Sequence, residues 1–141
     1  MSELVSPGVT AIETTVCSAP PRMPVTIITA MPSDANPDGD IFGGWMMSQM
    51  DLAANSVASR RAAGRTVTVA VDAMQFLSPV FVGDEVTIFA DIVYTGTTSL
   101  KIKVCAYARR RHTEETEKVT EAVFTFVKIG RDRRPKALPK K

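Results

Sequence analysis

Asp51 is the only charged residue in a segment, residues 41–59, that is otherwise made of apolar, small and uncharged polar residues. A side-chain carboxylate can act as a general base or as a nucleophile. In low-dielectric surroundings an ionised carboxylate costs several kcal/mol unless it is paired or hydrogen-bonded, and no Lys or Arg lies within two helical turns of Asp51. Asp51 is therefore either a functional group or a carboxylate that distant partners or solvent satisfy, and the pattern alone leaves both open.

The segment around Asp51 is predicted to be a buried helix because its apolar residues recur with a helical period. It has too many polar or helix-weakening positions, two glycines among them, for a membrane span. We expect the helix to begin near residues 42–44 and to end around residues 60–63, with Gly64 as its C-terminal stop. The expected core face carries Met46, Met50, Ala53 and Val57, and a polar strip on another face carries Ser48, Asp51 and Asn55.

Strands are predicted on both sides of this helix. A loop rich in Pro, Asp and Gly, residues 32–40, leads into the helix, and short turns separate the later strands. One helix must cover the hydrophobic face of a five-stranded antiparallel sheet, which predicts an α+β hotdog fold, in which a curled sheet wraps one long central helix. The predicted strands are residues 23–31, 66–77, 85–94, 99–110 and 118–129.

Composition is that of one globular domain. The 141 residues are 45% hydrophobic and 23% charged. The net charge of +2 combines a charge of +6 from residue 128 onward with −4 before it. We expect a mobile N-terminal arm at residues 1–22, a folded domain at residues 23–129 and a basic tail without regular structure at residues 130–141.

The cysteines and the N-terminus bear on metal binding and localisation. Neither Cys17 nor Cys105 has a second Cys or a His at metal-ligand spacing, so we expect no metal site. The N-terminal residues lack a basic region followed by a long apolar run, which argues against a secretory signal. We therefore expect a cytoplasmic protein.

The loop and helix sequence from Asn36 to Asp51, NPDGDIFGGWMMSQMD, resembles the segment that leads into the helix of YciA-like acyl-CoA thioesterases of the hotdog superfamily. The resemblance extends without gaps over roughly residues 24–129. The further matching segments are residues 66–71, 74–76, 79–80, 82–84, 99–103 and 121–126.

This resemblance implies hydrolysis of acyl-CoA thioesters to free acid and CoA, with no metal or redox cofactor. It also implies a homo-oligomer with the dimer as its minimal unit, commonly a trimer of dimers, with active sites at the subunit interface. Asp51 matches the catalytic carboxylate and Asn36 the catalytic-site asparagine, contributed to one site by different subunits.

The residue types agree with thioester chemistry. The unused backbone N–H groups at a helix N-terminus can stabilise an oxyanion, and Gly43 and Gly44 would allow close approach there or simply tight packing. Asp51 could act as a general base on water or as a nucleophile that forms an anhydride. Asn36 could orient the water or the carbonyl, or could instead form a turn.

CoA phosphates require basic groups or unpaired N–H groups. The candidates that match positions near the CoA entrance in the family are Arg65, Thr98, Ser99 and Lys101. Many relatives have Arg where this chain has Thr97. Residues 109–111 or the basic tail could supply the missing positive charge. Alternatively, each basic residue simply lies on a solvated strand face and binds no phosphate. The tail is basic, but it has no aromatic residues among its basic ones and no recognition motif, so the sequence does not favour nucleic-acid binding.

The sequence is compatible with two other functions to different degrees. A non-enzymatic acyl-CoA-binding hotdog module is the alternative, although a sensor is expected to carry an effector domain, for which residues 1–22 are too short. A hotdog dehydratase usually has a His in the helix region, and the only histidine, His112, is expected on the surface, which also argues against a Ser-His-Asp triad.

Overall fold

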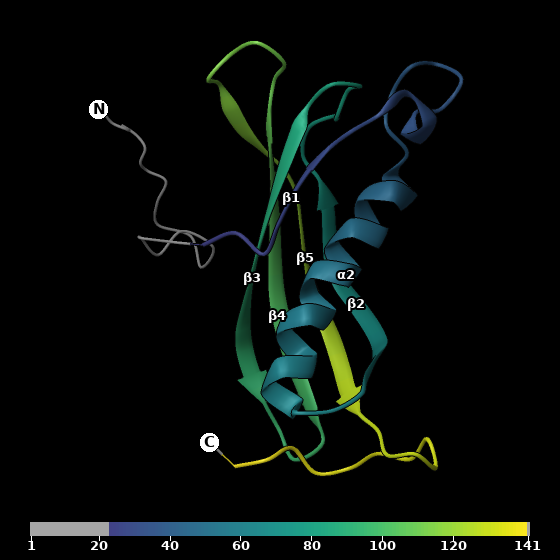
Figure 1. The fold of residues 1–141 in the computed structure, drawn as a ribbon, viewed down its shortest axis with the longest axis vertical. Helices are drawn as coiled ribbons and strands as arrows, with labels where there is room; N and C mark the ends of the chain where they lie inside the picture. The colour runs from purple at the N-terminus through teal and green to yellow at the C-terminus, as the bar shows by residue number, and fades with distance from the viewer. Residues whose placement is uncertain (1–22, 141) are drawn as a thin grey trace.

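The computed structural model describes residues 23–140, in which a five-stranded antiparallel sheet curls around one long helix, α2 (Gly43–Ala62) (Figure 1). The strand order is β1-β3-β4-β5-β2, so β1 and β2 form the two edges. The predicted α+β hotdog architecture is confirmed. The strands are β1 (Thr26–Thr29), β2 (Thr66–Phe76), β3 (Glu85–Thr95), β4 (Ser99–Arg109) and β5 (Thr116–Lys128).

The observed strands lie within two residues of the predicted bounds except for β1, which is shorter than the predicted residues 23–31. β1 pairs only with β3, and the pairing ends at Thr29 opposite Glu85, the first residue of β3. Beyond it the chain turns through a short 3-10 helix, η2 (Pro32–Asp34). The partner strand therefore sets the length of β1, which its own β-branched sequence cannot indicate.

The helix packs one face on the sheet. Val57, predicted to be buried, is only half-buried. In the second half of the helix the buried stripe instead follows the small residues Ala54, Ala58 and Ala62. The left-handed residue that ends the helix is Ala63 (φ 51°, ψ 42°), one position before the predicted Gly64. At Gly64 a Cβ would lie 3.1 Å from Cε of Lys128, so this glycine permits close packing. The buried helix residues are Met46, Met50, Ala53, Ala54, Ala58 and Ala62.

The sheet contributes the other half of the core. In β4 the side chains of Leu100, Ile102 and Val104 are fully buried, while Lys101 between them is exposed. This alternation is the predicted pattern of one dry and one wet face.

The C-terminal residues 130–140 form no helix or strand, yet they pack along the end of the sheet (Figure 1). Leu138 belongs to the core cluster and its N–H donates to the Thr97 carbonyl at 2.8 Å. Arg61 Nη1 donates to the Pro139 carbonyl at 2.8 Å. The tail therefore holds together the helix end and the β3–β4 turn. The predicted arm at residues 1–22 lies outside the described residues.

None of the helices in residues 23–140 has both the length and the apolar character that a membrane span requires.

Candidate functional site

Asp51 is half-buried on the side of α2 that faces β2. Thr68 Oγ1 donates a hydrogen bond to Asp51 Oδ1 at 2.6 Å. Within residues 23–140 Asp51 forms no ion pair, and its second oxygen, Oδ2, accepts no hydrogen bond. The carboxylate is thus oriented by a neutral hydroxyl while one oxygen stays available for chemistry.

The predicted polar strip of α2 continues one turn further along the same side. Asn55 Nδ2 donates to the Thr66 carbonyl at 3.3 Å and to Thr66 Oγ1 at 3.2 Å. Four residues of helix rise about 6 Å and two residues of strand about 6.6 Å, so Asp51 and Asn55 match Thr68 and Thr66 in register. This match fixes the carboxylate against the edge strand.

Thr68 was not among the predicted site residues. The signal that could have found it is the pair of threonines spaced by two at the start of β2, which matches the helix spacing of four between Asp51 and Asn55. Using that signal requires knowing that β2 lies antiparallel beside the helix, which periodicity alone does not give.

The N-terminus of α2 presents unused backbone donors. The N–H groups of Gly43 and Gly44 precede the first intrahelical bonds and have no hydrogen-bond partner among the described residues. A Cβ on Gly43 would lie 3.4 Å from ring carbons of Phe76, and a Cβ on Gly44 would contact nothing within 4 Å. Gly43 therefore both packs closely on Phe76 and exposes an amide suited to an oxyanion.

A cavity of about 370 Å³ opens beside this helix terminus. Its walls come from the start of α2, the end of β2, the following loop and β5. They are apolar except for two hydroxyl groups and backbone atoms. The lining residues are Ile41, Gly43, Met46, Phe76, Leu77, Ser78, Pro79, Val80 and Thr120.

Asn36 forms a turn, as one of its two predicted roles requires, and it does so through its side-chain oxygen alone. Oδ1 accepts hydrogen bonds from the N–H groups of Asp38 at 2.9 Å and Asp40 at 3.0 Å, which stabilises the loop before α2. Nδ2 has no partner within the described part of the chain. Asn36 can therefore act on a substrate only as a hydrogen-bond donor.

A single protomer does not bring these groups together. Asp51 lies eight residues beyond Gly43, which is about 12 Å along the helix axis. Asn36 lies before Gly43, on the loop side of the same terminus. The donors and the carboxylate can meet at one carbonyl only if two protomers contribute to the site.

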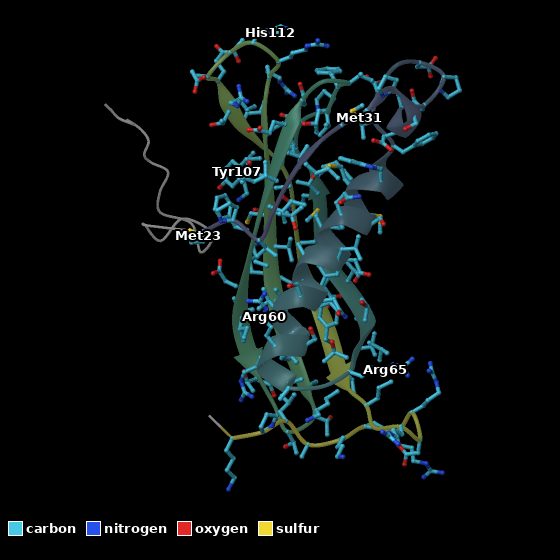
Figure 2. All side chains as sticks on the ribbon, in the orientation of Figure 1. Met23, Met31, Arg60, Arg65, Tyr107 and His112 are labelled. Carbon is cyan, nitrogen blue, oxygen red and sulfur yellow. The ribbon has the colours of Figure 1, made fainter. Side chains whose placement is uncertain are left out.

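The candidate CoA-binding residues gather at the other end of the molecule, where Figure 2 shows Arg65 beside the C-terminal tail. Arg65 and Thr98 flank the end of β5: Ile129 N–H donates to the Arg65 carbonyl at 3.0 Å and Lys128 N–H to the Thr98 carbonyl at 2.9 Å. Ser99 begins β4, and Lys101 is exposed two residues further on. The structure thus places Arg65 at the same end of the sheet as the segment from Thr98 to Lys101.

Arg109, Arg110 and Arg111 do not belong to this group. They lie at the far end of β4, an 11-residue strand of about 36 Å. Arg109 Nε donates to Glu85 Oε1 at 3.2 Å, and Arg110 bonds to Asp84 and Glu117. Within one protomer these arginines therefore lie far from the four candidates, and the alternative that they replace the missing arginine at Thr97 stays a prediction. His112, at the same end, is exposed as predicted (Figure 2).

Within residues 23–140, no group of three or more His, Cys, Asp or Glu side chains is arranged to hold a metal ion.

Comparison with known proteins places the chain in a family. The family model of the thioesterase superfamily matches residues 38–115. An uncharacterised acyl-CoA thioester hydrolase of Zymomonas mobilis is 48% identical over 121 residues, covering 86% of this chain and 81% of the relative. The acyl-CoA thioester hydrolase YciA of Escherichia coli is 46% identical over 113 residues, covering 78% of this chain and 86% of YciA.

A solved structure shows the same architecture. The hexameric thioesterase from Yersinia pestis superposes with a TM-score of 0.81 at 43% identity, over 87% of this chain and 100% of that one. The resemblance seen in the segment from Asn36 to Asp51 is thereby confirmed, and this chain belongs to the thioesterase superfamily.

Proposed function

We propose that this protein hydrolyses acyl-CoA thioesters to a free carboxylic acid and CoA. The observation that carries the proposal is Asp51, a carboxylate that Thr68 orients and that forms no ion pair within residues 23–140, on the central helix of a thioesterase-superfamily fold. The acyl-CoA thioester hydrolases among its relatives support the substrate class.

The proposed reaction uses the donors at one helix terminus and the carboxylate of another protomer. The N–H groups of Gly43 and Gly44 and the Nδ2 of Asn36 hold the thioester carbonyl oxygen as it gains negative charge. Asp51 removes a proton from water, whose oxygen adds to the carbonyl carbon. The C–S bond then breaks and the CoA sulfur takes the proton. In the alternative covalent route, Asp51 attacks the carbonyl carbon and the C–S bond breaks, which releases the CoA thiolate and leaves a mixed anhydride. Water then hydrolyses the anhydride to the free acid and the Asp51 carboxylate, and the thiolate takes up the proton that this step releases.

We propose a homo-oligomer whose minimal unit is a dimer, assembled as a trimer of dimers. The separation between Gly43 and Asp51 supports a shared site. The free edge of β2 supports it too, because this edge strand exposes Val69 and Phe76, and the neighbouring helix exposes Leu52. The relative from Yersinia pestis is hexameric.

The CoA phosphates are proposed to bind where Arg65, Thr98, Ser99 and Lys101 meet the basic tail. The tail begins after Ile129, whose N–H donates to the Arg65 carbonyl, and its exposed cations replace the arginine that this chain lacks at Thr97; they are Arg131, Arg133, Arg134 and Lys136. No metal or redox cofactor takes part in the proposed reaction.

The test is a thiol-release assay over a series of acyl-CoA lengths, on the wild type and Asp51→Asn. The variant keeps the side-chain shape and removes the basic oxygen, so kcat should fall by roughly 10²-fold or more. Glu114→Gln, which removes an exposed carboxylate from the β4–β5 turn, is the matched control and should keep full activity. Near-normal turnover by Asp51→Asn would exclude Asp51 from the mechanism, and acyl-CoA binding without CoA release by the wild type would indicate a binding module.

A single turnover in ¹⁸O-water detects an anhydride that water opens at the aspartyl carbon. Label that enters the carboxylate of Asp51 requires the anhydride, because water must then have attacked the aspartyl carbon. When Asp51 acts only as a general base, the label appears solely in the released acid.

A further inference from the structure

Thr120 carries a hydroxyl group that the fold itself does not use. The residue is 1% exposed, and its Oγ1 is the only buried side-chain nitrogen or oxygen in residues 23–140 without a hydrogen-bond partner. Buried polar groups are almost always paired, because an unpaired hydroxyl loses its hydrogen bonds to water without replacement. An orphan hydroxyl in a native core therefore calls for a function.

This hydroxyl lies in the wall of the cavity beside the helix terminus. The other side-chain hydroxyl in the lining is already engaged, since Ser78 Oγ donates to Glu117 Oε2 at 2.6 Å. The neighbouring Val119 carbonyl accepts the N–H groups of Leu77 at 2.7 Å and Ser78 at 3.3 Å. Thr120 thus carries the one side-chain hydroxyl in the lining of this cavity that has no hydrogen-bond partner among residues 23–140.

The cavity lies beside the proposed oxyanion donor, so the acyl chain of a bound thioester is the group that would enter it. Gly43, whose N–H is the proposed oxyanion donor, belongs to the same lining as Met46, Phe76 and Val80. A thioester carbonyl held at Gly43 directs its chain into these apolar walls. A volume of about 370 Å³ lies at the small end of ligand pockets, about 300–1,000 Å³, which suits a short chain.

We propose that Thr120 determines acyl specificity: its hydroxyl pairs with a hydroxyl group on a short acyl chain and favours such substrates over plain alkyl chains of equal length. The inference rests on the proposed function and specifies its substrate class. A site that hydrogen-bonds a substrate oxygen discriminates strongly against the analogue that lacks it, because the protein group is then left unpaired.

The experiment compares kcat/KM for 3-hydroxybutyryl-CoA and 4-hydroxybutyryl-CoA with that for butyryl-CoA. In the wild type at least one hydroxylated ester should be preferred. Thr120→Val removes the hydroxyl at nearly constant volume and should lower that preference about tenfold, chiefly by raising activity on butyryl-CoA and reducing it on the hydroxylated ester. Thr120→Ser, which keeps the hydroxyl, should retain the preference.

Thr116→Val is the matched control, because it makes the same change in the same strand at an exposed position outside the cavity. Urea unfolding should show Thr120→Val to be at least as stable as the wild type, since the hydroxyl has no hydrogen-bond partner in residues 23–140 and its burial is unfavourable. Should Thr120→Val prove unstable, Thr120→Ala provides a second hydroxyl deletion for the same ratio.

A preference that stays within twofold of the wild-type value in the hydroxyl-free variants overturns the proposal, as does a wild type that prefers butyryl-CoA over both hydroxylated esters. Failure of the proposed function would look different, because the wild type would then release CoA from none of the esters.

Discussion

Thr68 Oγ1 lies 2.6 Å from Asp51 Oδ1 and joins the edge strand β2 to the middle of the central helix. One helical turn away, Asn55 bonds to Thr66, so two polar pairs hold the polar strip of α2 against β2. The first pair includes the only carboxylate of the helix. Its geometry suggests that the edge strand positions the reactive group as well as closing the sheet.

Replacement of Thr68 by valine should lower kcat by about 10- to 100-fold, the range expected when a hydrogen bond to a charged group is lost. Valine keeps the branched shape but no longer restrains the rotation of Asp51. Steady-state kinetics with a short acyl-CoA would measure the effect. Thr68→Ser restores the donor and should recover most of the activity, and equal losses in both variants would assign Thr68 a packing role instead.

The sequence predicted the architecture well because strands and helix carry strong periodic signals. The alternation of Leu100, Lys101 and Ile102 marked the two faces of β4, and the spacing of Met46, Met50 and Ala53 marked the buried face of α2. What it missed depends on contacts across the fold. Ala63 rather than Gly64 ends the helix, and the length of β1 follows from where β3 begins.

Prediction of the site had the same limit. The candidate residues Asn36, Gly43 and Asp51 came from a resemblance in one continuous segment, whereas Thr68 and Thr120 lie on strands that only the folded chain brings to them. The orphan state of the Thr120 hydroxyl is likewise a property of its surroundings, which no local pattern encodes.

Asn36 allows the turn-forming and substrate-binding roles to be separated. Asn36→Asp keeps an oxygen that can accept from the N–H groups of Asp38 and Asp40 but removes the Nδ2 donor. We expect kcat to fall roughly 10²-fold, as for the loss of an oxyanion donor, with little change in the thermal unfolding midpoint. Asn36→Ala should reduce both activity and stability. Wild-type activity in Asn36→Asp would confine Asn36 to the loop.

Arg65 tests where the CoA phosphates bind. Arg65→Ala should raise KM for acyl-CoA by about tenfold with kcat nearly unchanged, because the phosphates stay bound throughout the reaction. KM for the matching acyl-N-acetylcysteamine thioester, which lacks the phosphates, should not change. Arg111→Ala removes an exposed arginine from the opposite end of the molecule and serves as the control. Equal changes in KM for both thioesters would contradict the assignment.

Glu117 should make a small, pH-dependent contribution to stability. The hydrogen bond from Ser78, followed by that from Arg110, lowers the pKa of the Glu117 carboxyl. A lowered folded-state pKa stabilises the protein above the unfolded-state pKa, and this stabilisation is lost as pH falls through the folded-state value.

Glu117→Gln should therefore reduce the free energy of unfolding at pH 7 by at most about 1 kcal/mol, since the Glu117 side chain is 49% exposed and solvent screens the ion pair. The difference from the wild type should disappear in strong acid. Urea titrations at pH 7 and at pH 3 would measure it. A difference that persists unchanged at the lower pH would show that charge is not its cause.

Leu138 tests whether the tail is part of the folded body. It is 9% exposed and packs in the core cluster, next to the hydrogen bond that its N–H donates to Thr97. Leu138→Ala should reduce the free energy of unfolding by about 2 kcal/mol, the low end of the range for buried leucines, because the site lies at the margin of the core. Lys136→Ala, at an exposed neighbouring position, should change it by less than about 0.5 kcal/mol. If Leu138→Ala were equally harmless, the Leu138 side chain would not hold the tail, and only the backbone hydrogen bonds to Arg61 and Thr97 would keep it on the folded body.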